Sequence, residues 1–242
     1  MSPALLPGLS IVLPCLDEAE NLRDVVRHST AAAEQFALRH EIVIVDDGST
    51  DDTIAIAGEL ASQDPRVQLV VHAFNRGYGE ALRSGIAAAS LPWVLMIDAD
   101  LQLDVAELGN FLAPAATADF VIGRRILMQG SVVRRLGSAV WRRFVQNALD
   151  LPVHDVDCAY RLVRLDLLRS LDLHADGPLA GAELLVKSRA AGARIAEVQV
   201  HHRARVAGRN TGVGTRMASG TLRELSKLRR AIDQRPMSGA GL

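Results

Sequence analysis

The sequence has few of the features that mark a secreted, disulfide-linked or membrane-spanning protein. Its two cysteines, Cys15 and Cys158, are too few for a disulfide framework and indicate no oxidising compartment. The longest apolar runs have the length of a strand, so we expect no segment that crosses a bilayer. No basic start is followed by an apolar stretch, so we expect no signal peptide. These absences favour a cytoplasmic protein in which both thiols are core residues.

Charge is unevenly distributed along the chain, although the formal net charge is only −1. Residues 1–120 hold six Lys/Arg and 18 Asp/Glu, whereas residues 121–242 hold 21 Lys/Arg and ten Asp/Glu. The acidic half is suited to a cation, and the basic half to phosphate or to peripheral contact with the inner face of an anionic membrane. The alternative interpretation of this charge distribution is that both kinds of charge lie on ordinary solvated faces. We expect no nucleic-acid partner.

The first half of the chain alternates short apolar runs with helical patterns. Continuous apolar strands separated by helices predict an α/β fold with a mostly parallel sheet covered on both faces. Strands are predicted at Leu9–Pro14, Glu41–Val45, Val67–His72 and Trp93–Ile97, with helices at about residues 18–38, 51–62 and 77–89.

The second half is less regular and contains no internal repeat and no clear linker. Strands are predicted at Phe120–Gly123, Ala159–Val163 and Arg194–Val200, and helices at about residues 131–149, 179–190 and 221–232. We therefore predict one domain over residues 1–215, followed by a basic C-terminal helix and tail over residues 216–242.

Polar segments follow three of the predicted strands, at the points where those strands end. They are Pro14–Glu18, Asp46–Ser49 and Asp98–Asp100. In open α/β sheets ligands bind beyond the carboxyl ends of the strands. We therefore expect the three segments to converge on one face of the domain.

Two of these segments bring carboxylates close together. Asp46 and Asp47 are adjacent, and their charges repel unless something binds them. Ser49 is predicted to cap the following helix, which accounts for the serine but not for the aspartates. Asp98 and Asp100 are separated by one residue and can face the same way; their hard oxygen ligands suit Mg²⁺ or Mn²⁺. A plain turn or a helix cap is the alternative for each pair.

A third pattern, Asn75-Arg76-Gly77-Tyr78-Gly79, begins a predicted helix. Two glycines at a helix start let the backbone approach a ligand closely. The pattern is neither a Walker loop nor a dinucleotide-binding fingerprint, and an ordinary turn is an equal alternative.

In order and spacing, the segments SIVLPCLDEAENL, EIVIVDDGSTDDT, NRGYGEALRSGI and WVLMIDADLQ resemble the inverting family 2 glycosyltransferases with the GT-A fold. The resemblance covers about residues 8–124, which would form the nucleotide-binding half, with an acceptor half at about 125–215. DADLQ, Gly123-Arg124-Arg125 and YRLV are most similar to the dolichol- or polyprenyl-phosphate mannosyl- and glucosyltransferases.

The resemblance implies a role for each matching residue. The nucleotide would be bound by Pro14, Asp17, Glu18, Asp46, Asp47, Gly77, Gly79 and Asp98. The metal would be held by Asp98, Asp100 and Gln102. Diphosphate or acceptor phosphate would be contacted by Arg124, Arg134, Arg203 and Arg205, whose fork geometry suits phosphate. The residues implied in catalysis are Asp100, Glu183 and Arg124.

The implied reaction is inverting transfer of a hexose from a nucleoside diphosphate sugar, of the GDP-mannose or UDP-glucose type, to a polyprenyl or dolichyl phosphate. A hydroxyl acceptor of glycan or natural-product synthesis is the alternative; it needs a carboxylate base, for which Glu183 and, more weakly, Asp157 are candidates. A sugar nucleotidyltransferase is disfavoured because no Gly-rich basic loop follows the first strand. A non-catalytic nucleotide-sugar-binding protein is the remote alternative, disfavoured by the intact aspartate pair.

Overall fold

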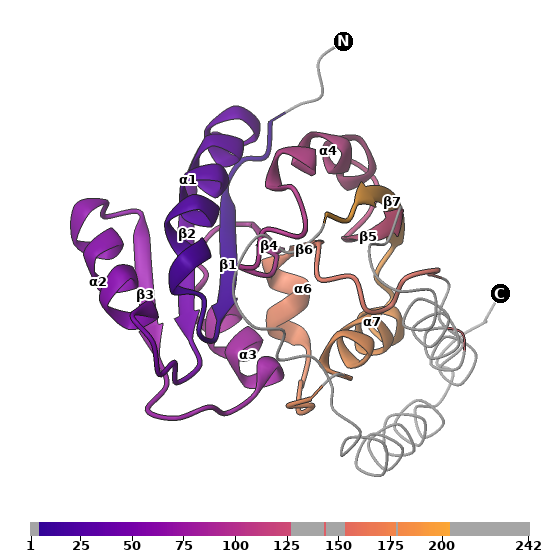
Figure 1. Ribbon diagram of the computed structural model, residues 1–242. Helices are drawn as coiled ribbons and strands as arrows, with labels where there is room; N and C mark the ends of the chain where they lie inside the picture. Colours follow the sequence, from indigo (N-terminus) through magenta and orange to yellow (C-terminus); the bar gives the residue numbers. More distant parts are fainter. Residues whose placement is uncertain (1–4, 127–142, 144–152, 178, 204–242) are drawn as a thin grey trace, which may run out of the picture.

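The computed structural model describes residues 5–126, 143, 153–177 and 179–203. Their seven strands form one sheet with the order β3-β2-β1-β4-β6-β5-β7 (Figure 1). The strands are β1 (Leu9–Cys15), β2 (His40–Asp46), β3 (Val67–Val71), β4 (Trp93–Met96), β5 (Phe120–Ile126), β6 (Arg161–Arg164) and β7 (Ile195–His201).

Strand direction divides the sheet into two parts. The strands β1 to β4 run parallel, as predicted, and their observed ends lie within two residues of the predicted ends. The strand β6 is antiparallel to both β4 and β5, whereas β5 and β7 are parallel. The expected mostly parallel α/β fold is therefore confirmed, with one reversed strand beside β4 that the apolar pattern did not reveal.

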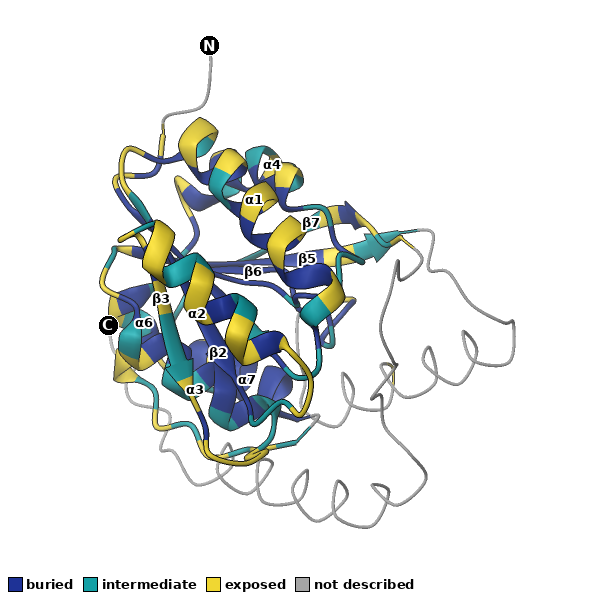
Figure 2. Ribbon diagram, turned by 60° about the vertical axis from the view of Figure 1, so that its left-hand side comes forward, coloured by how far each residue is buried: buried dark blue, intermediate teal, exposed yellow. Residues whose placement is uncertain are grey.

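Helices cover both faces of the sheet, with α1 and α4 on one face and α3 and α7 on the other (Figure 2). The predicted helices in the described residues are confirmed, whereas η1, α4 and α6 were not predicted. The helices are α1 (Ala19–Phe36), α2 (Thr53–Gln63), α3 (Tyr78–Ala88), the 3-10 helix η1 (Val105–Leu108), α4 (Gly109–Ala115), α6 (Leu165–Ser170) and α7 (Ala180–Ala190).

Several predictions concern segments outside the described residues. These are the helices at 131–149 and 221–232, the C-terminal tail, and the side chains of Arg134 and Arg205. Among the described residues, no helix is both long enough and apolar enough to cross a membrane. Cys15 and Cys158 are both buried free thiols, in agreement with the prediction that they belong to the core.

The helix α3 packs closely on β1 and β2, and this contact fixes where its first turn lies. A Cβ atom on Gly85 would come 2.3 Å from Val12 Cγ1 and 3.2 Å from Val45 Cγ2. Val12 and Val45 are fully buried in the middle of the sheet. Only glycine therefore lets α3 reach this position without displacing the strands.

We predict that Gly85→Ala lowers the free energy of unfolding by about 1–3 kcal/mol, because the added methyl group overpacks the α3–β1 contact. Gly58→Ala is the matched control, since Gly58 lies in the helix α2 and a Cβ there would meet nothing within 4 Å. This control should gain up to about 1 kcal/mol from helix propensity. Urea denaturation measures both variants, and equal stabilisation of the two would contradict the packing assigned to Gly85.

Candidate active site

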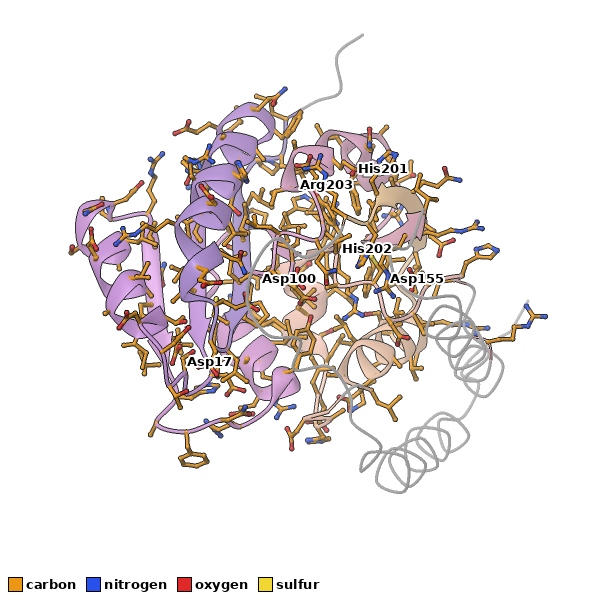
Figure 3. All side chains as sticks on the ribbon, viewed as in Figure 1. Asp17, Asp100, Asp155, His201, His202 and Arg203 are labelled. Carbon is orange, nitrogen blue, oxygen red and sulfur yellow. The ribbon has the colours of Figure 1, made fainter. Side chains whose placement is uncertain are left out.

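The carboxyl ends of β1, β2 and β4 lie side by side at one edge of the sheet. Cys15 at the end of β1 pairs with Asp46 at the end of β2, and Val12 of β1 pairs with Met96 of β4. The segments that follow these strands therefore converge, as the sequence predicts. In the view of Figure 3, Asp100 lies between Asp17, on the β1 side, and Asp155, which contacts Arg125 of β5 and Glu197 of β7.

Asp98 and Asp100 follow β4 and form the centre of the candidate site. Burial raises the pKa of Asp98 to about 6, with a further contribution from the charge of Asp100, while a hydrogen bond from the Tyr78 hydroxyl acts in the opposite direction. Leu101 adopts a left-handed φ of 58°, and Gln102 N donates to Asp100 Oδ1 at 3.0 Å. A tight turn thus holds two carboxylates whose repulsion a divalent cation would relieve.

Asp46, at the end of β2, is a buried carboxylate that is only partly satisfied by hydrogen bonds. Its side chain is fully buried, and Oδ2 accepts hydrogen bonds from Gly48 N and Ser49 N, each at 3.2 Å. Its Oδ1 has no hydrogen-bond partner among the described residues. Since buried carboxylate oxygens are costly to leave unsatisfied, this atom is left with an acceptor position that no described residue fills.

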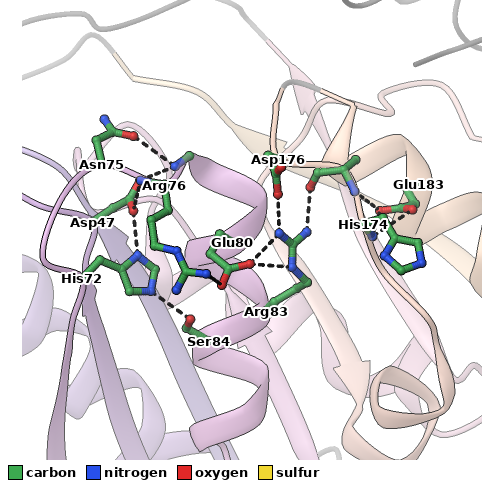
Figure 4. Close-up of polar contacts among 12 residues, drawn as sticks. Asp47, His72, Asn75, Arg76, Glu80, Arg83, Ser84, His174, Asp176 and Glu183 are labelled. Atoms are coloured by element: carbon green, nitrogen blue, oxygen red, sulfur yellow. Dashed lines mark hydrogen bonds and ion pairs between the residues drawn. The ribbon is translucent and has the colours of Figure 1, made fainter. Parts of the chain in front are cut away.

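Asp47, in contrast, is engaged within the protein. It is buried, and Oδ1 lies 2.7 Å from His72 Nδ1 and accepts from Arg76 N at 2.9 Å. Its Oδ2 accepts from Gly77 N, also at 2.9 Å (Figure 4). The adjacent aspartates therefore have different environments: Asp46 retains an unsatisfied oxygen, whereas Asp47 anchors the loop before α3. The prediction that Asp47 lies near the nucleotide stays untested.

The loops after β1 and β2 are joined by hydrogen bonds. Asp17, with a φ of 55°, donates its N–H to Ser49 Oγ at 2.9 Å, and its Oδ1 accepts from Thr50 N at 2.7 Å. Glu18 N donates to Thr53 Oγ1 at 2.9 Å. These contacts hold the two loops as one wall of the site.

The predicted helix cap at Ser49 is wrong. The helix α2 begins at Thr53, and Asp51 Oδ1 accepts from Thr53 N at 2.9 Å. The Ser49 hydroxyl instead accepts from Asp17, which lies 32 residues earlier in the chain. Ser49 therefore joins the loop after β2 to the loop after β1 and does not cap α2.

Pro14 and Glu18, the other residues predicted to border the nucleotide, lie in and just after β1. Pro14 is half-buried and pairs with Val45 in the sheet. Glu18 precedes α1, and its Oε2 accepts from Asn21 Nδ2 at 2.8 Å. Both residues lie beside Asp17 on the same wall, and their contact with nucleotide stays a prediction.

Gly77 and Gly79 are needed for an approach within the chain. Gly77 has a φ of 96°, and a Cβ on Gly79 would come 1.8 Å from the carbonyl oxygen of Ala175. Gly79 N donates to the carbonyl of Asp176 at 3.1 Å. The glycines therefore admit the backbone of residues 175–176, and nucleotide contact at these positions stays a prediction.

The turn that carries Asp100 is attached to the end of β7. Arg203 N donates to the Gln102 carbonyl at 2.8 Å, and Gln102 Nε2 donates to the Arg203 carbonyl at 3.3 Å. Arg203 Nη2 pairs with Asp104 Oδ2 at 2.6 Å. The backbone of Arg203 is thus joined to the turn that follows Asp100, although 101 residues separate it from Gln102, and its guanidinium is directed to Asp104. Arg124 is exposed on β5, opposite Gln199 of β7.

Glu183 lies on α7 and is only 3% exposed. Its Oε2 accepts from His174 N at 2.9 Å and from Ala175 N at 2.8 Å, and its Oε1 lies 2.7 Å from Lys187 Nζ. A carboxylate with three such partners is poorly placed to accept a proton from a substrate. The catalytic role predicted for Glu183 is therefore not favoured by its contacts.

Two residues of the site were missed in the sequence. The Tyr78 hydroxyl contacts Asp98, and burial raises the pKa of that hydroxyl. Arg161 of β6 is 2% exposed; Nη2 donates to the Val156 carbonyl at 3.0 Å, while Nε and Nη1 have no hydrogen-bond partner among the described residues. The positive charge of Arg161 acts on both Asp98 and Tyr78. An arginine inside the apolar run Tyr160–Val163 was the available signal.

A family comparison agrees with this geometry: the model described as glycosyl transferase family 2 matches residues 10–172. The chain belongs to glycosyl transferase family 2. An uncharacterized glycosyltransferase of Mycobacterium tuberculosis (strain ATCC 25618 / H37Rv) is 34% identical over 215 residues, covering 86% of this chain and 91% of the relative. The protein is therefore a glycosyltransferase, as the resemblance in the sequence implies.

Other family 2 relatives include the undecaprenyl-phosphate 4-deoxy-4-formamido-L-arabinose transferase of Pseudomonas fluorescens (strain SBW25), which is 32% identical over 174 residues. The match covers 71% of this chain but only 51% of that relative. Among solved structures, glucosyl-3-phosphoglycerate synthase from Mycobacterium tuberculosis, in complex with Mn²⁺, UDP-glucose and phosphoglyceric acid, superposes with a TM-score of 0.68 at 24% identity. The superposition covers 98% of this chain and 83% of the synthase chain, which shows that the two share the GT-A fold.

We predict that Asp98→Asn stabilises this glycosyltransferase at pH 7.5 without added divalent cation. The pKa of Asp98 is raised from 3.8 to about 6 in the folded protein, so its ionisation costs stability as the pH rises through that window. The cost is complete above pH 6, and its relief should be on the order of 1–3 kcal/mol.

Differential scanning fluorimetry at pH 7.5 and pH 4 measures this effect. The melting temperature of Asp98→Asn should exceed that of the wild type at pH 7.5, and the difference should shrink at pH 4. Asp24→Asn, on the exposed side of α1, is the control and should change little at either pH. A lower melting temperature for Asp98→Asn than for the wild type at pH 7.5 would mean that the ionised carboxylate of Asp98 does not destabilise the folded protein.

Proposed function

We propose that this glycosyltransferase moves a hexose from a nucleoside diphosphate sugar to an acceptor phosphate, with Asp98 and Asp100 holding Mg²⁺ or Mn²⁺. The observation that carries the proposal is the aspartate pair at the convergence of β1, β2 and β4. Burial and the charge of Asp100 disfavour the ionised form of Asp98, and a divalent cation held by the two carboxylates would stabilise it.

The donor is proposed to be of the UDP-glucose or GDP-mannose type. Glucosyl-3-phosphoglycerate synthase, which has the same fold, was crystallised with Mn²⁺ and UDP-glucose. In this chain the unsatisfied Oδ1 of Asp46 is an acceptor for a base or ribose N–H or O–H. Pro14, Asp17, Glu18 and the glycines of the α3 turn are proposed to complete the nucleotide site, with Gln102 near the metal.

The proposed reaction is displacement with inversion at the anomeric carbon. An acceptor oxygen forms the new bond to that carbon, and the bond to the departing diphosphate breaks. A bound divalent cation supplies charge neutralisation for the diphosphate. Arg203, placed beside the Asp100 turn, and Arg124 on β5 are proposed to stabilise phosphate charge during transfer.

A phosphate acceptor is favoured over a neutral hydroxyl by the contacts of Glu183. A hydroxyl acceptor requires a base, and the carboxylate of Glu183 is already occupied by two backbone N–H groups and Lys187. A phosphate monoester is an anion and needs little deprotonation. Because an undecaprenyl-phosphate transferase is a relative at 32% identity, we propose a polyprenyl phosphate as the acceptor, reached by peripheral contact with a membrane.

The second candidate acceptor is a small phosphorylated hydroxy acid. It is favoured by the likeness to glucosyl-3-phosphoglycerate synthase, whose crystals contained phosphoglyceric acid. In that case the nucleophile is a hydroxyl. A base other than Glu183 would be needed, because the carboxylate of Glu183 is already engaged within the protein.

The test is a matrix of donors and acceptors with the purified protein and Mn²⁺. UDP-glucose and GDP-mannose are each offered with undecaprenyl phosphate in detergent and with 3-phosphoglycerate, and products are detected by mass spectrometry. We predict a glycosylated undecaprenyl phosphate as the product. Its formation should be lost with EDTA and reduced at least 100-fold in Asp100→Asn. Turnover by Asp100→Asn at the wild-type rate, or in EDTA, would contradict the metal role, and a product from 3-phosphoglycerate alone would select the second acceptor.

A further inference from the structure

Glu183 is one end of a series of contacts that leads to Asp98. Its carboxylate fixes the backbone N–H groups of His174 and Ala175, and Lys187 joins it to the carbonyl of Asp172. All of these partners belong to the segment before α7 or to α7 itself. Glu183 therefore determines where residues 174–176 lie (Figure 4).

Residues 174–176 in turn pack against the first turn and a half of α3. Gly79 N donates to the Asp176 carbonyl at 3.1 Å, and Arg83 Nη1 donates to the Ala175 carbonyl at 3.0 Å. Arg83 also forms an ion pair with Asp176. The cavity that α3 and α7 leave between them has a volume of about 10 Å³, the room of about one water molecule. The contact between residues 174–176 and α3 is thus closely packed.

The opposite side of the same turn is fixed by the sheet. Asp47 accepts from Arg76 N and Gly77 N, and His72, which orients Asp47, also lies 2.9 Å from Ser84 Oγ of α3. The first turn of α3 and the residues just before it are therefore held by hydrogen bonds to Asp47 on one side and to residues 174–176 on the other. Tyr78, the first residue of the helix, points its hydroxyl from this clamped turn to Asp98.

We propose that Glu183 is a positioning residue for transfer rather than its general base. It holds residues 174–176 against α3, so that Tyr78 keeps Asp98 oriented for the cation and the donor diphosphate. This role connects α7, in the acceptor half, to the donor site. It rests on the metal-dependent donor binding proposed above.

A double-mutant cycle tests the connection. Glu183→Gln, Tyr78→Phe and the double variant are compared with the wild type by calorimetric titration with UDP or GDP, whichever the wild type binds more tightly, in the presence of Mn²⁺. Glu183→Gln removes the negative charge of the side chain and replaces the oxygen that faces Lys187 Nζ, or the one that accepts from the backbone N–H groups, with an amide NH₂. Tyr78→Phe removes the hydroxyl at the other end of the series. Each single variant should weaken binding about tenfold, and the double variant also about tenfold rather than about a hundredfold, because both act through the same contact.

Kinetics separate positioning from proton transfer. Positioning predicts a donor KM raised about tenfold in Glu183→Gln, with an unchanged pH dependence of kcat. A general base predicts instead that kcat falls 10²- to 10⁴-fold, that the pH limb of the base disappears, and that donor binding stays normal.

Arg83→Met provides a second variant if Glu183→Gln does not fold, since Arg83 is partly exposed and acts on the same segment from α3. It should weaken nucleotide binding several-fold. Arg23→Met is the matched control, because Arg23 pairs with Glu59 on the surface of α1 and α2, and it should bind like the wild type.

The outcomes distinguish the two proposals. If the wild type binds no nucleoside diphosphate with Mn²⁺, the proposed function fails, and the positioning role fails with it. If the wild type binds but Glu183→Gln and Arg83→Met bind equally well, only the positioning role is overturned. Losses that multiply in the double variant would show that Glu183 does not act through Tyr78.

Discussion

The repulsion between carboxylates at the end of β4 is the constraint on which the site depends. Asp98 and Asp100 are held together by a turn with a left-handed residue, and Asp98 is buried enough for its pKa to rise to about 6. Ionising a carboxylate that is largely removed from water and lies beside a like charge costs free energy, and a bound cation would reduce that cost. The surrounding contacts are arranged to keep the pair in place: Tyr78 contacts Asp98, Arg203 holds the turn through Gln102, and the joined loops after β1 and β2 form the adjacent wall.

Much of this arrangement could be predicted because it follows from periodicity. The runs Leu9–Pro14 and Glu41–Val45 are mostly apolar and are separated by a helical pattern, and this alternation predicts buried parallel strands joined by a helix. Once the strands were placed, the acidic segments had to meet at one edge. The direction of β6 was not predictable in the same way, because an apolar run such as Tyr160–Val163 reads the same in a parallel and an antiparallel strand. Short elements such as α4, with seven residues, carry too little periodic signal.

Individual roles depended on side-chain contacts that the residue pattern does not specify, some of them with partners far away in the chain. Asp46 and Asp47 are adjacent and identical, yet one keeps an unsatisfied oxygen and the other anchors the loop before α3. Ser49 was assigned to a local cap, whereas its partner is Asp17. Glu183 matched a position expected near the acceptor, but its carboxylate is directed to the backbone of residues 174 and 175. In each case the residue type was informative about the neighbourhood but not about the contact.

The most direct measurement of the central claim is anomalous diffraction at the manganese edge, from crystals of the protein grown with Mn²⁺ and UDP. The account predicts one strong peak at coordination distance from a carboxylate oxygen of Asp98 or Asp100 and from the diphosphate, with the uridine beside Asp46. Bound UDP with no peak at these aspartates, or a manganese site elsewhere in the chain, would contradict it.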